Sequence, residues 1–240
     1  MHNRLRDIPG LATLAVEHGV RLIEVRDPPP ALAVGTGRKR SGKRLLTVGT
    51  DCALGKKYTA LTIARELARR GVPATFRATG QTGIMIAGGG MPMDAIIADF
   101  AAGAAELLSP DAAPNHWDVI EGQGSLFHPA YAGVALSLLH GSQPDVIIVC
   151  HEPGRTSMLG HPDHPLPEVD ETIAMNLHLG ARTNGGIRCA GISLNTGALS
   201  AVEAERLIAA ESDRLGLAVA DPMRGGQPLD RMIDDILASA

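Results

Sequence analysis

A glycine-rich loop between an apolar strand and a helix is the feature that most constrains how this chain can fold. The apolar run Leu45–Val48 precedes the loop, and a stretch with helical periodicity, residues 56–70, follows it. This order of strand, glycine loop and helix defines a P-loop, whose backbone N–H groups and helix N-terminus attract phosphate. We therefore assign cofactor binding to the loop residues Gly49, Thr50, Asp51, Cys52, Ala53, Leu54, Gly55 and Lys56, together with Lys57.

Lys57 is an informative departure from the general P-loop pattern. A serine or threonine at this position places a hydroxyl group on Mg²⁺, whereas an ammonium group cannot ligate a cation and adds positive charge that favours phosphate. Thr59 lies too far along the chain to replace the missing hydroxyl. The sequence therefore predicts a loop that holds a pyrophosphate for affinity and not for magnesium-dependent cleavage.

Short apolar runs alternate with helix-period stretches from Leu45 onward, which is typical of parallel βαβ units. Most of the runs are apolar throughout, as expected for strands covered by helices on both faces. The predicted strands are Leu45–Val48, Ala74–Arg77, Val119–Ile120, Val146–Cys150, Ala190–Leu194 and Leu217–Ala220. The predicted helices are Lys56–Arg70, Met93–Leu108, Ala130–His140, Glu168–Leu179, Leu199–Arg214 and Leu229–Ala238. We predict an α/β fold with a doubly wound, mostly parallel sheet of the P-loop NTPase type.

The amino-acid composition argues against nucleic acid and membranes as binding partners. Among 240 residues with a net charge of −4 there are one Trp, two Tyr and three Phe, too few for a surface that stacks nucleic-acid bases. The chain begins with no apolar signal segment and contains no run of about 18 apolar residues. We therefore expect a cytoplasmic protein that binds a small molecule and neither nucleic acid nor a membrane. The sequence permits a homo-oligomer.

Residues 1–43 form a predicted N-terminal segment and linker before the P-loop domain at 44–240. The segment contains a predicted helix at Leu11–His18, a predicted strand at Arg21–Val25, and a linker that the triple proline Pro28–Pro30 stiffens. The basic run Arg38–Arg44 has two interpretations, a solvated connector or a positive rim over the phosphate site.

Glu121 and His128 are the candidates for proton transfer. Glu121 ends a buried predicted strand, which places it at the carboxyl edge of the sheet beside the phosphate loop. It can ligate a metal ion, act as a base, or orient the loop. His128 follows in the same loop, and because histidine titrates near neutrality it is either a proton carrier or a structural loop residue.

The end of the predicted strand Ala74–Arg77 and the residues after it supply one guanidinium group together with amide and hydroxyl groups. Arg77 ends the strand, and its guanidinium group suits a carboxylate or phosphate because it binds these groups through two aligned donors. Gln81 and Thr82 follow with amide and hydroxyl groups. The alternative for Arg77 is a surface arginine at a strand end.

Two later loops add candidates at the same sheet edge. The histidine-rich loop after Val146–Cys150 contains Arg155, a second candidate for substrate binding. Prolines interrupt this loop and break any regular face of metal ligands, so we predict no metal site. Asn195 ends a later strand and has two interpretations: its amide group binds a nucleobase, or the residue forms a simple turn.

Four motifs in this chain resemble those of one known P-loop family. They are Gly-Thr-Asp-Cys-Ala-Leu-Gly-Lys-Lys, Ala-Thr-Gly-Gln-Thr-Gly, Glu-Gly-Gln-Gly-Ser-Leu-Phe-His-Pro and Cys-His-Glu-Pro-Gly-Arg. The chain is similar to a family long catalogued as a domain of unknown function, some of whose members are D-glutamate N-acetyltransferases of D-amino-acid catabolism. More distantly it resembles dethiobiotin synthetase. Family members usually carry a Rossmann-like domain upstream, so the resemblance implies that residues 1–43 are its remnant.

The resemblance implies an N-acetyltransferase that moves an acetyl group from acetyl-CoA to the amine of an acidic amino acid such as D-glutamate. Lys56 and the loop amides would hold the phosphates of the donor. Arg77, Gln81 and Thr82 would line the side of the acetyl acceptor, and Glu121 and His128 would transfer protons. Two alternatives are an ATP- and Mg²⁺-dependent ligase or kinase of the dethiobiotin synthetase type and a nucleotide-binding regulatory module without chemistry.

Overall fold

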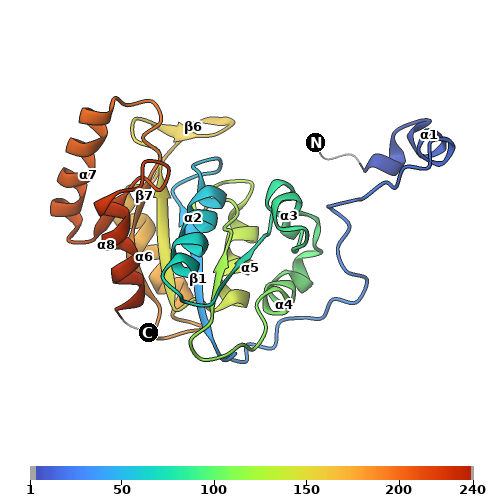
Figure 1. The fold of residues 1–240 in the computed structure, drawn as a ribbon, viewed down its shortest axis with the longest axis horizontal. Coiled ribbons are helices and arrows are strands. Elements are labelled where there is room, and N and C mark those ends of the chain that lie inside the picture. Colours follow the sequence, from blue (N-terminus) through green and yellow to red (C-terminus); the bar gives the residue numbers. More distant parts are fainter. Residues whose placement is uncertain (1–3, 239–240) are drawn as a thin grey trace.

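Parallel strands form the central sheet of the chain, whose computed structural model describes residues 4–238 (Figure 1). In this described part the sheet has six strands in the order β2-β3-β1-β4-β7-β8, and every neighbouring pair is parallel. The strands are β1 (Lys43–Gly49), β2 (Ala74–Arg77), β3 (Trp117–Ile120), β4 (Val146–His151), β7 (Arg188–Leu194) and β8 (Ala218–Ala220). The predicted α/β fold with a mostly parallel sheet is confirmed.

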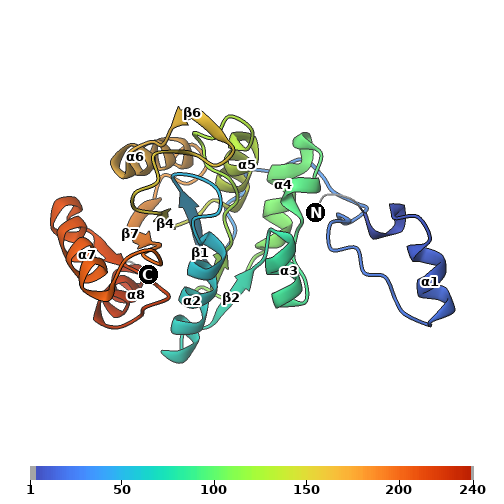
Figure 2. The same cartoon turned by 90° about the horizontal axis from the view of Figure 1, so that it is seen from above.

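Helices cover both faces of the sheet because the strands carry apolar residues on both sides (Figure 2). One face carries α2 (Lys56–Arg69) and α8 (Gln227–Leu237), and the other carries α4 (Ala98–Leu108), α5 (Ala132–Ser142), α6 (Val169–Gly180) and α7 (Ala201–Leu215). Leu45 of β1 packs with α2 and α8, and the next residue, Leu46, packs with α4 and α5. Leu46 lies level with Ile147 of β4, which packs with α6 and α7. Within residues 4–238 no helix has the length and apolar character needed to cross a membrane.

The topology places a ligand crevice at the carboxyl end of β1. The chain leaves β1 toward β2 and β3 on one side and then crosses from β3 to β4 on the other side. The strand order therefore reverses at β1, and open α/β sheets bind ligands at such a point. Gly122 follows β3 and lies against β1: a Cβ atom on Gly122 would be 1.6 Å from the carbonyl oxygen of Thr47. Only glycine permits this close approach, which brings the loop after β3 beside the phosphate loop.

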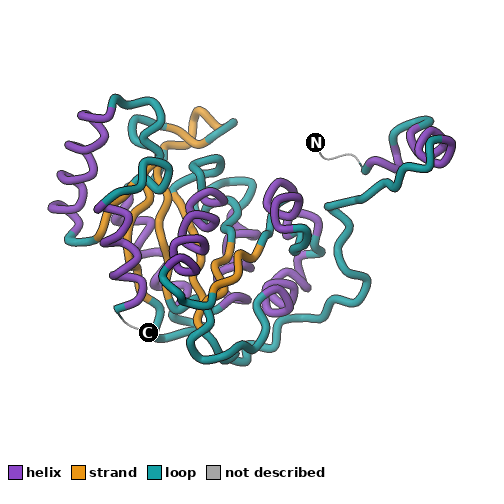
Figure 3. Tube along the Cα trace, in the orientation of Figure 1, coloured by secondary structure: helices purple, strands orange, loops and turns teal. Residues whose placement is uncertain are grey.

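The structure differs from the predicted pattern in four places. The short helix α3 (Gln81–Ala87) and the hairpin of β5 (Ser157–Met158) and β6 (His161–Pro165) were not predicted. The predicted helix Met93–Leu108 is divided into a 3₁₀ turn, Met93–Ala95, and α4. The strand predicted at Arg21–Val25 is wrong, because this segment pairs with no strand in residues 4–238 and a lone strand has no hydrogen-bonding neighbour. Helix α1 (Leu11–Glu17), which was predicted, lies away from the main body (Figures 1 and 3).

The basic run Arg38–Arg44 lies at the amino end of β1, opposite the phosphate loop. Arg40 and Arg44 are buried; Nη2 of Arg40 donates to the carbonyl oxygen of Gly141 at 2.7 Å, and Nη1 of Arg44 donates to the carbonyl oxygen of Arg40 at 3.0 Å. Burial lowers the pKa of Arg40 to about 10. The run is therefore not a rim over the phosphate site, and its two buried arginines make it more than a solvated connector.

Candidate active site

The phosphate loop runs from Gly49 to Lys56 at the carboxyl end of β1. Gly49 lies so close to β4 that a Cβ atom would be 2.8 Å from the carbonyl oxygen of Cys150. Gly55 has a φ of +101°, a left-handed conformation that favours glycine, immediately before α2 begins. The Nζ atom of buried Lys56 donates to the carbonyl oxygen of Asp51 at 2.6 Å, and burial lowers the lysine pKa. The loop thus has the curled backbone and the inward lysine that a phosphate cradle needs.

Asp51 joins the loop to the β5–β6 hairpin. Its buried carboxylate accepts hydrogen bonds from the backbone N–H of Leu159 at 2.7 Å and from Nη1 of Arg155 at 3.0 Å. The same Nη1 donates to the carbonyl oxygen of Cys52 at 2.8 Å, and Nη2 pairs with Glu152. Arg155, predicted on the substrate side, therefore lies against the phosphate loop, where two of its five N–H donors remain for a ligand.

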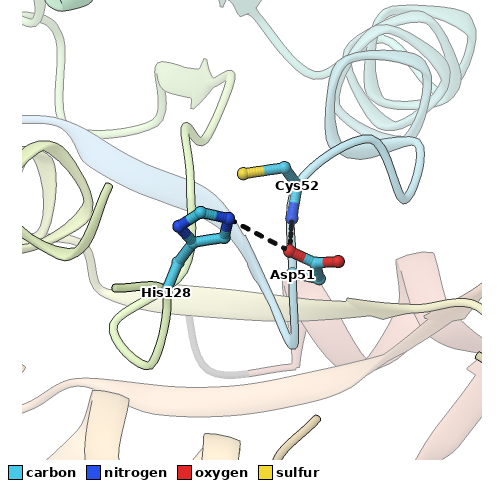
Figure 4. A group of neighbouring side chains, drawn as sticks. All are labelled: Asp51, Cys52 and His128. Carbon is cyan, nitrogen blue, oxygen red and sulfur yellow. Dashed lines mark hydrogen bonds and ion pairs between the residues drawn. The ribbon is translucent and has the colours of Figure 1, made fainter. Parts of the chain in front are cut away.

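Three potential ligand atoms of Asp51, Cys52 and His128 lie within 4.8 Å of one another (Figure 4). The Nε2 atom of His128 is 3.8 Å from Oδ1 of Asp51, beyond hydrogen-bond distance. The ring of His128 is fully buried, and its Nδ1 accepts a hydrogen bond from the backbone N–H of Ala130 at 3.1 Å. The Asp51 carboxylate already accepts hydrogen bonds from Arg155 and Leu159, and these bonds would compete with a metal ion. The argument for a metal ion at these three residues therefore rests on the proximity of their ligand atoms.

Glu121 follows β3, and its carboxylate lies against the start of helix α3. Its buried Oε2 accepts hydrogen bonds from the backbone N–H groups of Thr79 at 2.9 Å and Gly80 at 3.1 Å. A Cβ atom on Gly83 would be 2.1 Å from the same oxygen, so the helix is packed directly on the carboxylate. Burial raises the pKa of Glu121 despite these two bonds. The geometry supports the loop-orienting role, and the upward direction of the pKa shift is the one that suits a general base.

The three candidates after β2 occupy different places. Gln81 and Thr82 open helix α3 next to the segment that holds Glu121. The Nε atom of Arg77 donates to Oδ1 of buried Asp118 at 2.7 Å. In the register of β2 and β3, Asp118 lies opposite Thr75, two residues before Arg77. The guanidinium group of Arg77 therefore turns back from the carboxyl edge of the sheet. Of the two predicted arginines, Arg155 lies at the loop and Arg77 does not contact it.

The carboxyl ends of β4 and β7 border a cavity of about 380 Å³ whose lining includes His151, Leu194, Leu207 and Glu211. His151 also contacts the phosphate loop, since its Nδ1 is 3.0 Å from Oγ1 of Thr50. Asn195 follows directly after Leu194, is exposed, and its Oδ1 accepts a bond from the backbone of Gly197 at 3.3 Å. The cavity and the phosphate loop are therefore neighbours at one sheet edge.

The hydroxyl group of Thr59 faces away from the loop. Its Oγ1 lies 2.7 Å from Oγ of Ser193 in β7, in the buried interface between α2 and the sheet. The side chain of Lys57 places its Nζ 4.6 Å from the centre of the Tyr58 ring. Neither residue supplies a hydroxyl group where P-loop enzymes bind Mg²⁺.

Some residues of the site carried no usable sequence signal. Thr79 and Leu159 contribute through backbone N–H groups, which nearly every residue type has. His161 and Tyr131 pack against the ring of His128, with centroid distances of 5.0 and 4.5 Å. For His161, unlike the other three residues, the sequence did carry a signal. Its loop is rich in histidine and was expected at the same sheet edge as the loop of His128.

Comparison with known proteins agrees with this geometry. A family model described as "Domain of unknown function (DUF1611_C) P-loop domain" matches residues 32–232. The chain belongs to the DUF1611 family. The crystal structure of a DUF1611 family protein from Anabaena variabilis superposes with a TM-score of 0.91 at 35% identity, covering 99% of this DUF1611 chain and 70% of that protein.

Two curated relatives connect this DUF1611 chain with an activity. The D-glutamate N-acetyltransferase of Tritonibacter scottomollicae is 49% identical over 238 residues, which are 99% of the chain and 71% of that protein. The D-glutamate N-acetyltransferase of a Pseudoalteromonas species is 45% identical over 239 residues, all of the chain and 70% of that protein. The predicted acyltransferase class is confirmed: the DUF1611 chain is an N-acetyltransferase with a P-loop fold.

Proposed function

We propose that this chain transfers the acetyl group of acetyl-CoA to the amine of an acidic amino acid such as D-glutamate. The observation that carries the proposal is the 49% identity with a D-glutamate N-acetyltransferase over nearly the whole chain. The phosphate loop supports it, because coenzyme A carries a pyrophosphate and needs such a cradle. D-amino-acid catabolism is the process to which this reaction would belong.

The donor is proposed to lie across the phosphate loop. The N–H groups of residues 49–55 and the ammonium group of Lys56 would bind its pyrophosphate. Lys57 adds a second positive charge at the start of α2. The cavity beside His151 would take the adenosine end, and Asn195 follows Leu194 of its lining directly in the sequence. This arrangement points the thioester end toward Glu121 and His128.

The reaction is a direct acyl transfer. The neutral amine nitrogen of the amino acid attacks the thioester carbonyl carbon, a C–N bond forms, the C–S bond breaks, and coenzyme A leaves as a thiolate that takes up a proton. The amine loses one proton to a base, and Glu121 and His128 are the two candidates named from the sequence. A hydrogen-bond donor at the carbonyl oxygen lowers the barrier because negative charge develops there.

The acetyl acceptor is proposed to bind through its carboxylates. Arg155 is our first choice, because it lies on the phosphate loop with two N–H donors uncommitted. Arg77 is the second, because its Nε is held by Asp118. Gln81 and Thr82 at the start of α3 would contribute amide and hydroxyl groups.

Calorimetric titration of the chain with acetyl-CoA, with ATP and Mg²⁺, and with ADP tests the proposal. We expect acetyl-CoA to bind and its affinity to be unchanged in EDTA. Tight binding of ATP only in the presence of Mg²⁺ would contradict the proposal in favour of a ligase or kinase. Binding of ADP and ATP together with no binding of acetyl-CoA would favour a nucleotide-binding regulatory module.

A further inference from the structure

His128 carries a buried nitrogen with an unmet hydrogen-bonding requirement. Its side chain is 0% exposed, and Nε2 has no hydrogen-bond partner among the described residues. Buried polar atoms in folded proteins almost always have such a partner, so an orphan atom beside a ligand loop calls for an explanation. The carboxylate of Asp51 is close by, but its Oδ1 at 3.8 Å is too distant to be that partner.

The other ring nitrogen determines where the proton of His128 is. The backbone N–H of Ala130 donates to Nδ1 at 3.1 Å, so Nδ1 must present a lone pair. In a neutral imidazole the proton then resides on Nε2. Nε2 is therefore a donor, with no lone pair to accept a proton from a substrate amine or to bind a metal ion.

The surroundings hold this ring in place. Tyr131 stacks on it with a centroid distance of 4.5 Å, and His161 packs edge-on at 5.0 Å. The groups that face the ring are thus Tyr131, His161, Asp51 and Cys52. Because Nε2 is covered, a ligand reaches it only when a neighbour moves. Strands β5 and β6 pair only with each other among the described strands, so the hairpin that carries His161 can shift without breaking the central sheet once the hydrogen bond from Leu159 to Asp51 is released.

We propose that His128 is a hydrogen-bond donor to an uncharged carbonyl oxygen of the acyl donor, and that it is not the base. The charge of Asp51 selects this chemistry, because a phosphate oxygen brought to Nε2 would lie close to a carboxylate whereas a carbonyl oxygen carries no full charge. The oxygen we assign is that of the acetyl thioester, which is uncharged in the bound donor and whose carbonyl an N–H donor polarises for attack. This inference rests on the proposed function. It leaves Glu121 as the candidate base.

The tautomer can be measured without any activity. Long-range ¹H–¹⁵N spectra of the chain labelled with ¹⁵N-histidine distinguish the two neutral tautomers, and His128→Gln identifies the signals of this residue. We expect the Nε2–H form. An Nδ1–H form would overturn the inference whether or not the chain transfers acetyl groups.

Kinetics with two variants test the catalytic part. His128→Gln keeps an N–H donor near the position of Nε2, and His128→Phe keeps a ring without one. We expect His128→Phe to lower kcat about a hundredfold, and His128→Gln to keep at least a tenth of kcat with the acid limb of the pH profile intact. Equal loss in both variants, with disappearance of that limb, would show a base and overturn the inference. Thermal unfolding of both variants verifies folding.

Binding assays separate the thioester carbonyl from the amide carbonyls of the pantetheine arm. Coenzyme A has the amides and lacks the thioester. We expect His128→Phe to weaken binding of acetyl-CoA more than binding of coenzyme A. Equal weakening of both would overturn the assignment to the thioester oxygen. If the wild-type chain binds acetyl-CoA but transfers no acetyl group, the proposed function fails while the tautomer result still decides the state of His128.

Discussion

Oε2 of Glu121 occupies the space beside Gly83 so closely that a Cβ atom on this glycine would be 2.1 Å away. The contact packs the first turn of α3 on the carboxylate that follows β3, and Gly80 donates its N–H to the same oxygen at 3.1 Å. The position of Glu121 therefore depends on a residue without a side chain.

Gly83→Ala tests this dependence. The added methyl group must displace the carboxylate or the helix, so we expect a loss of stability of about 1–3 kcal/mol and a fall in kcat of at least tenfold. Gly133→Ala is the matched control, because a Cβ atom on this glycine of α5 would meet nothing within 4 Å. Steady-state kinetics and thermal unfolding of both variants are the measurements. Equal behaviour of the two would contradict the close packing.

The raised pKa of Glu121 predicts a pH dependence. If Glu121 is the base, kcat/KM rises with pH through a pKa above the ordinary 4.5 of glutamate, and Glu121→Gln removes this limb. Stability moves in the opposite direction: between 4.5 and the raised pKa the folded chain binds more protons than the unfolded chain, so the free energy of unfolding falls as pH rises. A profile of Glu121→Gln identical to that of the wild type would exclude this base.

Lys56→Ala tests the phosphate loop. The substitution removes a charge-assisted contact of roughly 1.5–3 kcal/mol, which corresponds to about tenfold to a hundredfold weaker binding of acetyl-CoA. Lys43→Ala removes a lysine at the amino end of β1, the strand that precedes the loop, and is the control. The measurement is the dissociation constant of acetyl-CoA for each variant, determined by calorimetry. Unchanged affinity in Lys56→Ala for each phosphate-bearing ligand tested would refute the assignment of the loop.

The two arginines make different predictions for substrate binding. Arg155→Lys keeps the charge at the loop and loses the planar array of donors, so we expect the KM of the acidic amino acid to rise more than the KM of acetyl-CoA. Arg77→Lys should change stability more than either KM, because Arg77 pairs with buried Asp118. Initial rates with each substrate varied in turn are the test. A rise in the amino-acid KM only in Arg77→Lys would reverse the assignment.

The sequence predicted the sheet well because most of its strands are buried on both faces and contain continuous apolar runs. Val146–Cys150 is such a run and was predicted within one residue of β4. The half-buried strand β2 was also predicted at its observed bounds, Ala74–Arg77. It also predicted the phosphate loop, since Gly49, Gly55 and Lys56 have fixed spacings. Arg155 was predicted to bind substrate, which stays a prediction, and its side chain contacts Asp51 and Cys52 of the loop.

Other features depend on contacts that residue types do not reveal. The ends of strands indicated which residues meet at the sheet edge, but not that Arg77 turns back to Asp118. The Arg21–Val25 segment contains three aliphatic residues and was predicted as a strand, yet strand formation depends on a neighbour that pairs with it. The tautomer of His128 depends on a single backbone N–H, that of Ala130, which any residue but proline would supply.

The most direct test of the central claim is the formation of an N-acetylated amino acid by the purified chain. The chain is incubated with acetyl-CoA and D-glutamate in EDTA without ATP, and product is measured by mass spectrometry together with the release of free coenzyme A thiol. The account predicts equal amounts of both products, no effect of EDTA, and their loss in Lys56→Ala at low donor concentration. Product that forms only when ATP and Mg²⁺ are added would contradict it.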